Sequence, residues 1–500
     1  MKFSVNKFDC IGMVIFATCI AFFGLLSEHK AYLQYNDIEL CGIYCKMAKN
    51  YGTLLWLQEF DKYYFSKSLT SLFSWILTKA INVKNDSSTI NFIIESFNGI
   101  YLIISALMWY KICHFCKVYQ LNSWLGFVGM FFSHTFLNLT PHAQESPDNA
   151  AFLVGMMAIY FLVLKSIKGL FLTLIISTMI QPQLKIILIP IICFFKLEDF
   201  VKSQNFKFQR IINFCIFIDN KLNFLQKNQK REIFFWIGIF AFIFTLLSFC
   251  SFFLYPPYFG LSSISIPLLP VSILLQSFLL GYSFYHLKII SSFRFIIFYL
   301  LNRVFLKRCL YCICILFIFK ITSNFIAQGE VMSINSLTLG QALFIYTFFQ
   351  QSIAQPAMAV IIHLTFYGPL IALFFLYWPK IAKNINFFGP GFVISFGIIL
   401  CLSNGIESRH MIAFMPWFTI MLLIRNPKFS SSEIFVFFLL QILASRFYAS
   451  YHGDYQNEND PYLMIWGPWV SADHYWDYAI YGIISFIIIF LFYKIKIRKH

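Results

Sequence analysis

Apolar stretches long enough to cross a lipid bilayer recur from one end of this chain to the other, and they constrain its fold more than any other feature. A transmembrane helix needs roughly 20 predominantly apolar residues. Only 12% of the 500 residues are charged, about half the share that is usual in a soluble protein. The sequence therefore predicts an all-α integral membrane protein. Residues 1–500 are expected to form one polytopic domain with about 12–14 transmembrane helices.

Lysine and arginine gather in alternate loops, which predicts how the spans are oriented. Because cytoplasmic loops carry an excess of these residues, the basic segment 196–232 is assigned to the cytoplasm. The loops 28–89, 327–355 and 450–477 then lie on the extracytoplasmic side. Apolar patches in the first of these loops predict amphipathic helices on the membrane surface.

The net charge of +16 is explained by this topology, so no nucleic acid partner is expected. The partners expected instead are membrane lipids. The thirteen cysteines are interpreted as small apolar helix residues rather than zinc ligands. The sequence identifies no set of metal ligands. A divalent cation could assist the carboxylates described next, but nothing in the sequence requires one.

Two carboxylates, Asp37 and Glu39, lie in the first extracytoplasmic loop. A carboxylate at the membrane face can act as general base toward a hydroxyl group. It can also bind a metal ion or hydrogen-bond a sugar. The alternative is that both are ordinary solvated surface acids.

Polar residues also mark the ends of two later apolar stretches. Asp148 lies just before the predicted span 150–164. Ser146 or Asp148 could cap that helix, or Asp148 could face the same cavity as Asp37. Gln181 and Gln183 flank Pro182 between two short apolar segments. These segments predict either a re-entrant hairpin with a polar tip that lines a cavity or a plain helical hairpin.

A third polar group is Glu407-Ser408-Arg409-His410, at the outer end of a predicted span. Arg409 places a positive charge on the outer side, which is unusual for that side of a membrane protein. Its guanidinium group suits a phosphate or pyrophosphate. His410 could add a hydrogen bond or share a proton. The alternative is an interfacial ion pair between Arg409 and Glu407. His363, within the predicted span 357–377, is expected to be a buried histidine with its hydrogen bonds satisfied.

At these residues the chain resembles the GT-C superfamily of multi-spanning glycosyltransferases. Asp37-Ile38-Glu39, followed by Tyr44, Met47 and Ala48, looks like the acidic motif of that family's first outer loop. The motifs that resemble its later sites are Pro147-Asp148-Asn149, Gln181-Pro182-Gln183 with Pro190, and Glu407-Ser408-Arg409-His410 with Pro416.

The resemblance implies an enzyme that transfers a sugar, of a hexosyl or mannosyl type, from a polyprenyl-phosphate donor to a lipid, glycan or protein. It makes Asp37 the base or the acid that positions the acceptor, with Glu39 and Asp148 as further catalytic carboxylates. Arg409 would contact the donor phosphate, beside His410, Glu407, Gln181 and Gln183 as substrate-binding residues. The first loop has no adjacent pair of acids, which leaves the choice between Asp37 and Glu39 open.

Two other functions remain alternatives: a polysaccharide polymerase or flippase of the cell envelope, and a secondary transporter. Transporters usually place ionisable groups in the middle of spans, whereas here most lie at loop edges. The low charge and the excess of Lys over Arg favour a bacterial inner membrane with the active site facing the periplasm. In a eukaryote the corresponding location would be the membrane of the endoplasmic reticulum.

Overall fold

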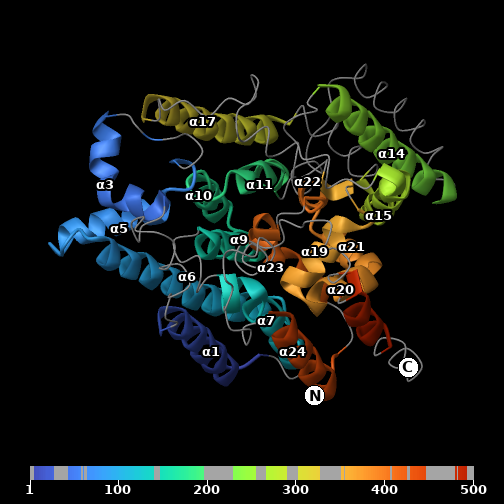
Figure 1. Ribbon diagram of the computed structural model, residues 1–500, viewed down its shortest axis with the longest axis horizontal. Coiled ribbons are helices and arrows are strands. Elements are labelled where there is room, and N and C mark those ends of the chain that lie inside the picture. Colours follow the sequence, from blue (N-terminus) through green and yellow to red (C-terminus); the bar gives the residue numbers. More distant parts are fainter. Residues whose placement is uncertain are drawn as a thin grey trace.

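The computed structural model describes fourteen segments of the chain, and every regular element in them is helical (Figure 1). The segments are 5–26, 43–57, 60, 65–139, 147–195, 229–254, 266–289, 302–326, 351–353, 355–405, 408–424, 428–445, 479–480 and 482–491. No β-strand occurs within them. The prediction of an all-α fold is therefore confirmed.

The elements of the N-terminal half gather around one long helix, α6, which runs diagonally across Figure 1. Both α1 and α9 pack along it, and α10 packs on the other side of α9. The bounds are α1 Lys7–Leu26, α3 Ile43–Leu57, α5 Leu69–Ala80, α6 Ser87–Phe115, α7 Gln120–Phe131, the π-helical turn η1 Thr135–Leu139, α9 Asp148–Val163, α10 Ile167–Ser177 and α11 Pro182–Phe194.

The C-terminal half packs against α7, α9 and α11 and closes the core. The bounds are α14 Gln229–Leu254, η3 Ile266–Leu268, α15 Leu269–Leu287, α17 Arg303–Ile326, η5 Gln351–Ile353, α19 Met358–Tyr367, α20 Pro369–Leu376, α21 Trp378–Phe387, α22 Pro390–Leu402, η6 Ser408–Phe414, α23 Met415–Leu423 and α24 Ser431–Ser445. A last apolar helix covers Gly482–Leu491. One large apolar core connects both halves.

Two helices of the described residues are long and apolar enough to cross a membrane: Ser87–Phe115 and Arg231–Ser248. Shorter apolar helices, of 10–17 residues, occupy several other predicted spans. Local backbone breaks explain their length. The predicted span 357–377 divides at Gly368, which has φ +64° and precedes Pro369, and a second positive φ occurs at Gly389 before Pro390. Pro cannot continue a helix from the preceding turn, but it is favoured at the first position of a new one.

The outward faces of the helices are largely apolar, and many polar side chains point inward. Phe234 and Phe242 on α14 are 69% and 67% exposed, and Phe317 on α17 is 61% exposed. Ser277, Ser395, Thr419 and Gln441, by contrast, have no exposed surface. Most of the buried hydroxyls donate to a carbonyl one turn earlier, as Ser395 does to Gly391. Outward faces this rich in large apolar side chains are unusual in water-soluble proteins.

Helices α3 and α5 lie within the predicted first loop, where amphipathic helices are expected. Trp56, near the end of α3, is 86% exposed, whereas Tyr51 on the same helix is buried and hydrogen-bonds Ser68 over 3.0 Å. Cys45 on α3 is disulfide-bonded. The interpretation of all cysteines as plain apolar helix residues is thus wrong for Cys45, because the sequence pattern carried no information on its pairing.

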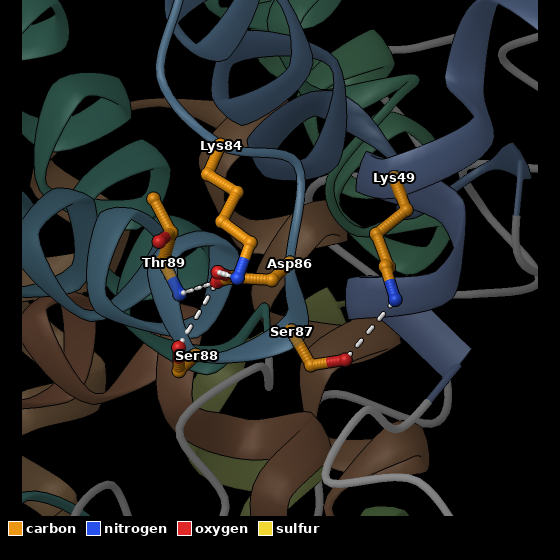
Figure 2. A network of polar contacts seen from close by, with 6 residues as sticks. All are labelled: Lys49, Lys84, Asp86, Ser87, Ser88 and Thr89. Carbon is orange, nitrogen blue, oxygen red and sulfur yellow. Dashed lines mark hydrogen bonds and ion pairs between the residues drawn. The ribbon is translucent and has the colours of Figure 1, made fainter.

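A polar network fastens α3 to the start of α6 (Figure 2). Asp86 is the N-cap of α6, and its carboxylate accepts a hydrogen bond of 2.8 Å from the Thr89 backbone N–H. Lys84 lies 3.2 Å from the same carboxylate. Lys49 of α3 reaches the Ser87 hydroxyl at 3.1 Å. These contacts fix where the first loop returns to the helical core.

Helices α10 and α11 form a helical hairpin joined at residues 178–181. Gln181 stands at the N-cap of α11, and Pro182 follows at its first position. Pro190 lies inside α11 without ending it. The Ser395 hydroxyl donates to the Ile187 carbonyl at 2.7 Å in that turn. The hairpin is therefore tied to α22, and the polar break that the sequence marked lies at Gln181.

Candidate functional site

The central feature of the site is an ion pair between Asp148 and Arg409, which are 261 residues apart in the chain. Asp148 is the first residue of α9, and Arg409 is the second residue of η6. Arg409 Nε donates to Asp148 Oδ2 over 3.0 Å, and the two side chains are 16% and 11% exposed. At such low exposure, removing one partner leaves a poorly solvated charge, which costs about 3 kcal/mol.

The interpretation of Asp148 as a helix cap is wrong. The N-cap of α9 is Pro147, whose side chain makes no capping hydrogen bond. Asp148 lies one position later, in the first helical turn, where a negative charge interacts favourably with the helix dipole. Its carboxylate is directed to Arg409 instead. The alternative pairing of Arg409 with Glu407 is not tested, because Glu407 lies outside the described residues, as do Asp37 and Glu39.

Gln181 joins this pair from a third segment of the chain. Its Nε2 donates to the His410 carbonyl at 2.9 Å, and the side chain is 5% exposed. Its Oε1 is buried and has no hydrogen-bond partner among the described residues, and the same holds for Gln183 Oε1. Because buried polar atoms are nearly always paired in native proteins, these two oxygens mark places where a bound donor group fits.

Ser408 is held in place by two aromatic residues of α19. His363 Nε2 lies 2.7 Å from the Ser403 carbonyl, and its Nδ1 lies 2.8 Å from Ser408 Oγ. A carbonyl can only accept, so Nε2 carries a proton, and in the neutral ring Nδ1 accepts from Ser408. The expectation of a satisfied, buried His363 is confirmed. The Tyr367 hydroxyl donates to the Ser408 carbonyl at 2.7 Å, and the Thr135 side chain lies beside the same hydroxyl.

The close packing of η6 against α9 depends on Gly155. A β-carbon on Gly155 would overlap the Ala413 carbonyl oxygen. Trp417 Nε1 donates to the Gly155 carbonyl at 3.0 Å. This close approach sets η6 against α9, so the backbone that carries Arg409 lies within reach of Asp148.

A cavity of about 110 Å³ opens between α15, α19, α20, α22 and α23, and His363 and Tyr367, which contact Ser408, line it. Its walls are mostly aromatic and aliphatic, including Phe374, Trp378 and Phe418. Its polar lining includes Ser403, Asn404 and Gln276, and Gln276 Nε2 donates to Asn404 Oδ1. A mostly apolar space with a few polar groups suits a molecule with a hydrocarbon body and a polar head.

Of the eight residues proposed from the sequence, the structure brings Asp148, Arg409, Gln181 and His410 into one cluster. Sequence reasoning missed Tyr367, Thr135 and Gly155. Only Gly155 left a signal, as a lone glycine within an apolar helix. No group of three or more His, Cys, Asp or Glu side chains in the described segments could hold a metal ion.

No protein-family model matches the chain, and no curated protein or solved structure matches it either.

Proposed function

We propose that this chain is a multi-spanning membrane glycosyltransferase. It transfers a sugar from a polyprenyl-phosphate donor to a lipid, glycan or protein acceptor on the extracytoplasmic side. The observation that carries the proposal is the shielded Asp148–Arg409 pair, assembled with Gln181 and His410 beside an apolar cavity. Such a reaction needs a cation that binds the phosphate, a carboxylate that acts as base and an apolar cavity for the hydrocarbon chain.

Membrane insertion by about 12–14 spans is supported by the exposed phenylalanines of α14 and α17 and by the buried hydroxyls of the core. Water would oppose such a surface, whereas lipid favours it. The disulfide at Cys45 supports the extracytoplasmic placement of the first loop, because disulfides persist in the periplasm and other oxidising compartments. A bacterial inner membrane fits both features.

Arg409 is the proposed phosphate ligand. A guanidinium has five N–H donors in a planar fork that matches phosphate oxygens, and the bond to Asp148 uses Nε–H. Charge-assisted hydrogen bonds of this kind contribute about 1.5–3 kcal/mol each.

The carboxylates supply the base. The acceptor hydroxyl attacks the anomeric carbon, the bond from that carbon to the phosphate oxygen breaks, and the hydroxyl proton passes to a carboxylate. Asp37, Glu39 and Asp148 are the candidates for this role. Asp37 and Glu39 belong to the predicted first loop, and the network of Figure 2 fastens the end of that loop to α6. Gln181 and Gln183 would hydrogen-bond the sugar hydroxyls through their buried oxygens.

The mostly apolar cavity supports a donor with a hydrocarbon chain. Phe374, Trp378 and Phe418 offer apolar walls, and His363, which contacts Ser408 next to Arg409, also lines the cavity. The hydrocarbon would then lie between helices while its phosphate approaches η6.

The experiment uses the purified full chain in lipid nanodiscs with a panel of polyprenyl-phosphate hexoses and extracted membrane lipids as acceptors. The expected result is release of polyprenyl phosphate with a matching gain of sugar on an acceptor. Asp148→Asn should bind donor but turn it over at least 10-fold more slowly, since general base catalysis contributes about 10²–10⁴-fold. Polymer formed without release of polyprenyl phosphate would favour the polymerase, and ion-driven uptake into proteoliposomes would favour the transporter.

A further inference from the structure

Three cysteine thiols meet where the end of α11 packs on the start of α17. Cys309 Sγ lies 3.3 Å from Cys193 Sγ, although 116 residues separate them in the chain. Cys312 is one turn beyond Cys309 on α17, and its side chain lies beside Cys193. All three are free thiols in this structure. Cys193 thus contacts the Cys309 thiol and faces a second cysteine on the same neighbouring helix.

The backbone around these thiols is held from both sides. The Arg308 guanidinium donates to the Phe195 carbonyl, two residues after Cys193. The rings of Phe194 and Phe305 pack with centroids 4.9 Å apart. A disulfide bond is about 2.05 Å long, so the two sulfur atoms need to close by little more than about 1 Å, which side-chain rotation can supply.

The three thiols differ in access. Cys193 and Cys312 are 2% and 1% exposed, whereas Cys309 is half-buried. A reagent therefore reaches Cys309 first, and Cys193 is in place to react with whatever forms there. The short distance between the two sulfur atoms and their unequal access favour oxidation of this pair to a disulfide.

We propose that Cys193 and Cys309 are a redox pair that closes to a disulfide and links α11 to α17. The oxidant is a low-molecular-weight disulfide. The Cys309 thiolate attacks it, forms a mixed disulfide and releases one thiol. The Cys193 thiolate then attacks the Cys309 sulfur and releases the second thiol. The two protein thiols lose two electrons and two protons, and the external disulfide gains them.

The Cys193–Cys309 disulfide would fix α11, whose N-cap is Gln181, to α17, a helix outside the candidate site. The proposal itself does not rest on the glycosyltransferase assignment. It needs only the two sulfur atoms and the packing that holds them.

The test incubates the full chain in nanodiscs with excess glutathione disulfide, alkylates the remaining thiols and maps peptides by mass spectrometry without reduction. The expected product is a Cys193–Cys309 linked peptide that disappears on reduction. It should be lost in Cys193→Ser and in Cys309→Ser. The matched control is Cys314→Ser, which removes an exposed thiol from the same helix and should leave the link intact.

Two outcomes overturn the proposal in the wild-type chain, so the result does not depend on whether the variants fold. Cys309 that ends as a stable mixed disulfide with glutathione shows that Cys193 cannot close the bond. Cys309 that stays unmodified while exposed Cys314 has reacted shows that the pair is not accessible to a disulfide oxidant.

Discussion

Gly155 in α9 lies so close to the Ala413 carbonyl of η6 that no side chain fits between them. Asp148 is two helical turns before Gly155, and Arg409 is four residues before Ala413. The backbone contact and the ion pair therefore lie on the same two elements. The contact between Gly155 and Ala413 sets the distance between α9 and η6 at which Asp148 and Arg409 can pair.

Gly155→Ala should destabilise the protein by more than about 2 kcal/mol, because overpacking a rigid contact costs 1–3 kcal/mol and here the obstacle is backbone. The measurement is thermal unfolding in detergent. Gly238→Ala is the matched control, since a β-carbon on Gly238 of α14 meets nothing within 4 Å. That variant should be neutral or slightly stabilising. Equal melting temperatures for both variants would show that α9 and η6 are not in rigid contact.

Asp148 and Arg409 should be strongly coupled in a double-mutant cycle. Asp148→Asn and Arg409→Ala each leave a shielded partner without its counter-charge, at an expected cost of about 3 kcal/mol apiece. The double variant should lose clearly less than the sum of the two, because no unpaired charge remains. Unfolding free energies of the four proteins give the coupling directly. Strictly additive losses would mean that the ion pair does not form in solution.

Asp86 should make the first turn of α6 sensitive to acid. The Thr89 N–H is the main cause that holds the Asp86 pKa well below its ordinary value, and hydrogen bonds from Ser88 and Lys84 add to it. A depressed folded-state pKa contributes stability that is present above the unfolded value of about 4. That contribution is lost as the pH falls from there toward the folded-state pKa.

Hydrogen exchange of the Thr89 amide measures this effect. Its protection in the wild type should fall as the pH drops below about 4, after correction for the intrinsic exchange rate. In Asp86→Asn the corrected protection should be independent of pH, because the amide oxygen does not titrate in this range. The same acid dependence in both proteins would assign it to another group.

Asp9 should connect α1 to α7. Its carboxylate accepts from Gln120 Nε2 at 2.8 Å and from Trp124 Nε1 at 3.0 Å, and its side chain is 5% exposed. Asp9→Ala leaves both donors without their acceptor, at an expected cost of about 2 kcal/mol. Asp9→Asn keeps one acceptor oxygen and should lose less. Chemical unfolding followed by circular dichroism would compare the two, and equal losses would contradict the role of the acceptor.

The sequence predicted the helical class, because hydrophobic runs and loop charges are local signals. It also identified Asp148, Gln181 and Arg409, since polar residues at the ends of apolar runs stand out. It did not predict that Asp148 pairs with Arg409, because that contact depends on tertiary packing across 261 residues. Tyr367, which donates a hydrogen bond to Ser408, looked like any other aromatic residue of an apolar helix.

The hydropathy of the sequence also could not predict where the helices break. An average over some 18 residues does not register that Gly368 adopts a positive φ before Pro369. The same limit hid the thiol cluster of Cys193, Cys309 and Cys312, whose members lie on two helices. The roles of Asp37, Glu39 and Glu407 stay predictions.

The binding of undecaprenyl phosphate to the wild type, Asp148→Asn and Arg409→Ala tests the central claim most directly. Both variants break the same ion pair and should lose similar stability, so they control for each other's folding. Arg409→Ala should bind the lipid at least 10-fold more weakly, as expected for loss of a charge-assisted bond of about 1.5–3 kcal/mol, whereas Asp148→Asn should bind it as well as the wild type or better. Equal affinity in all three proteins would contradict a lipid-phosphate site at Arg409.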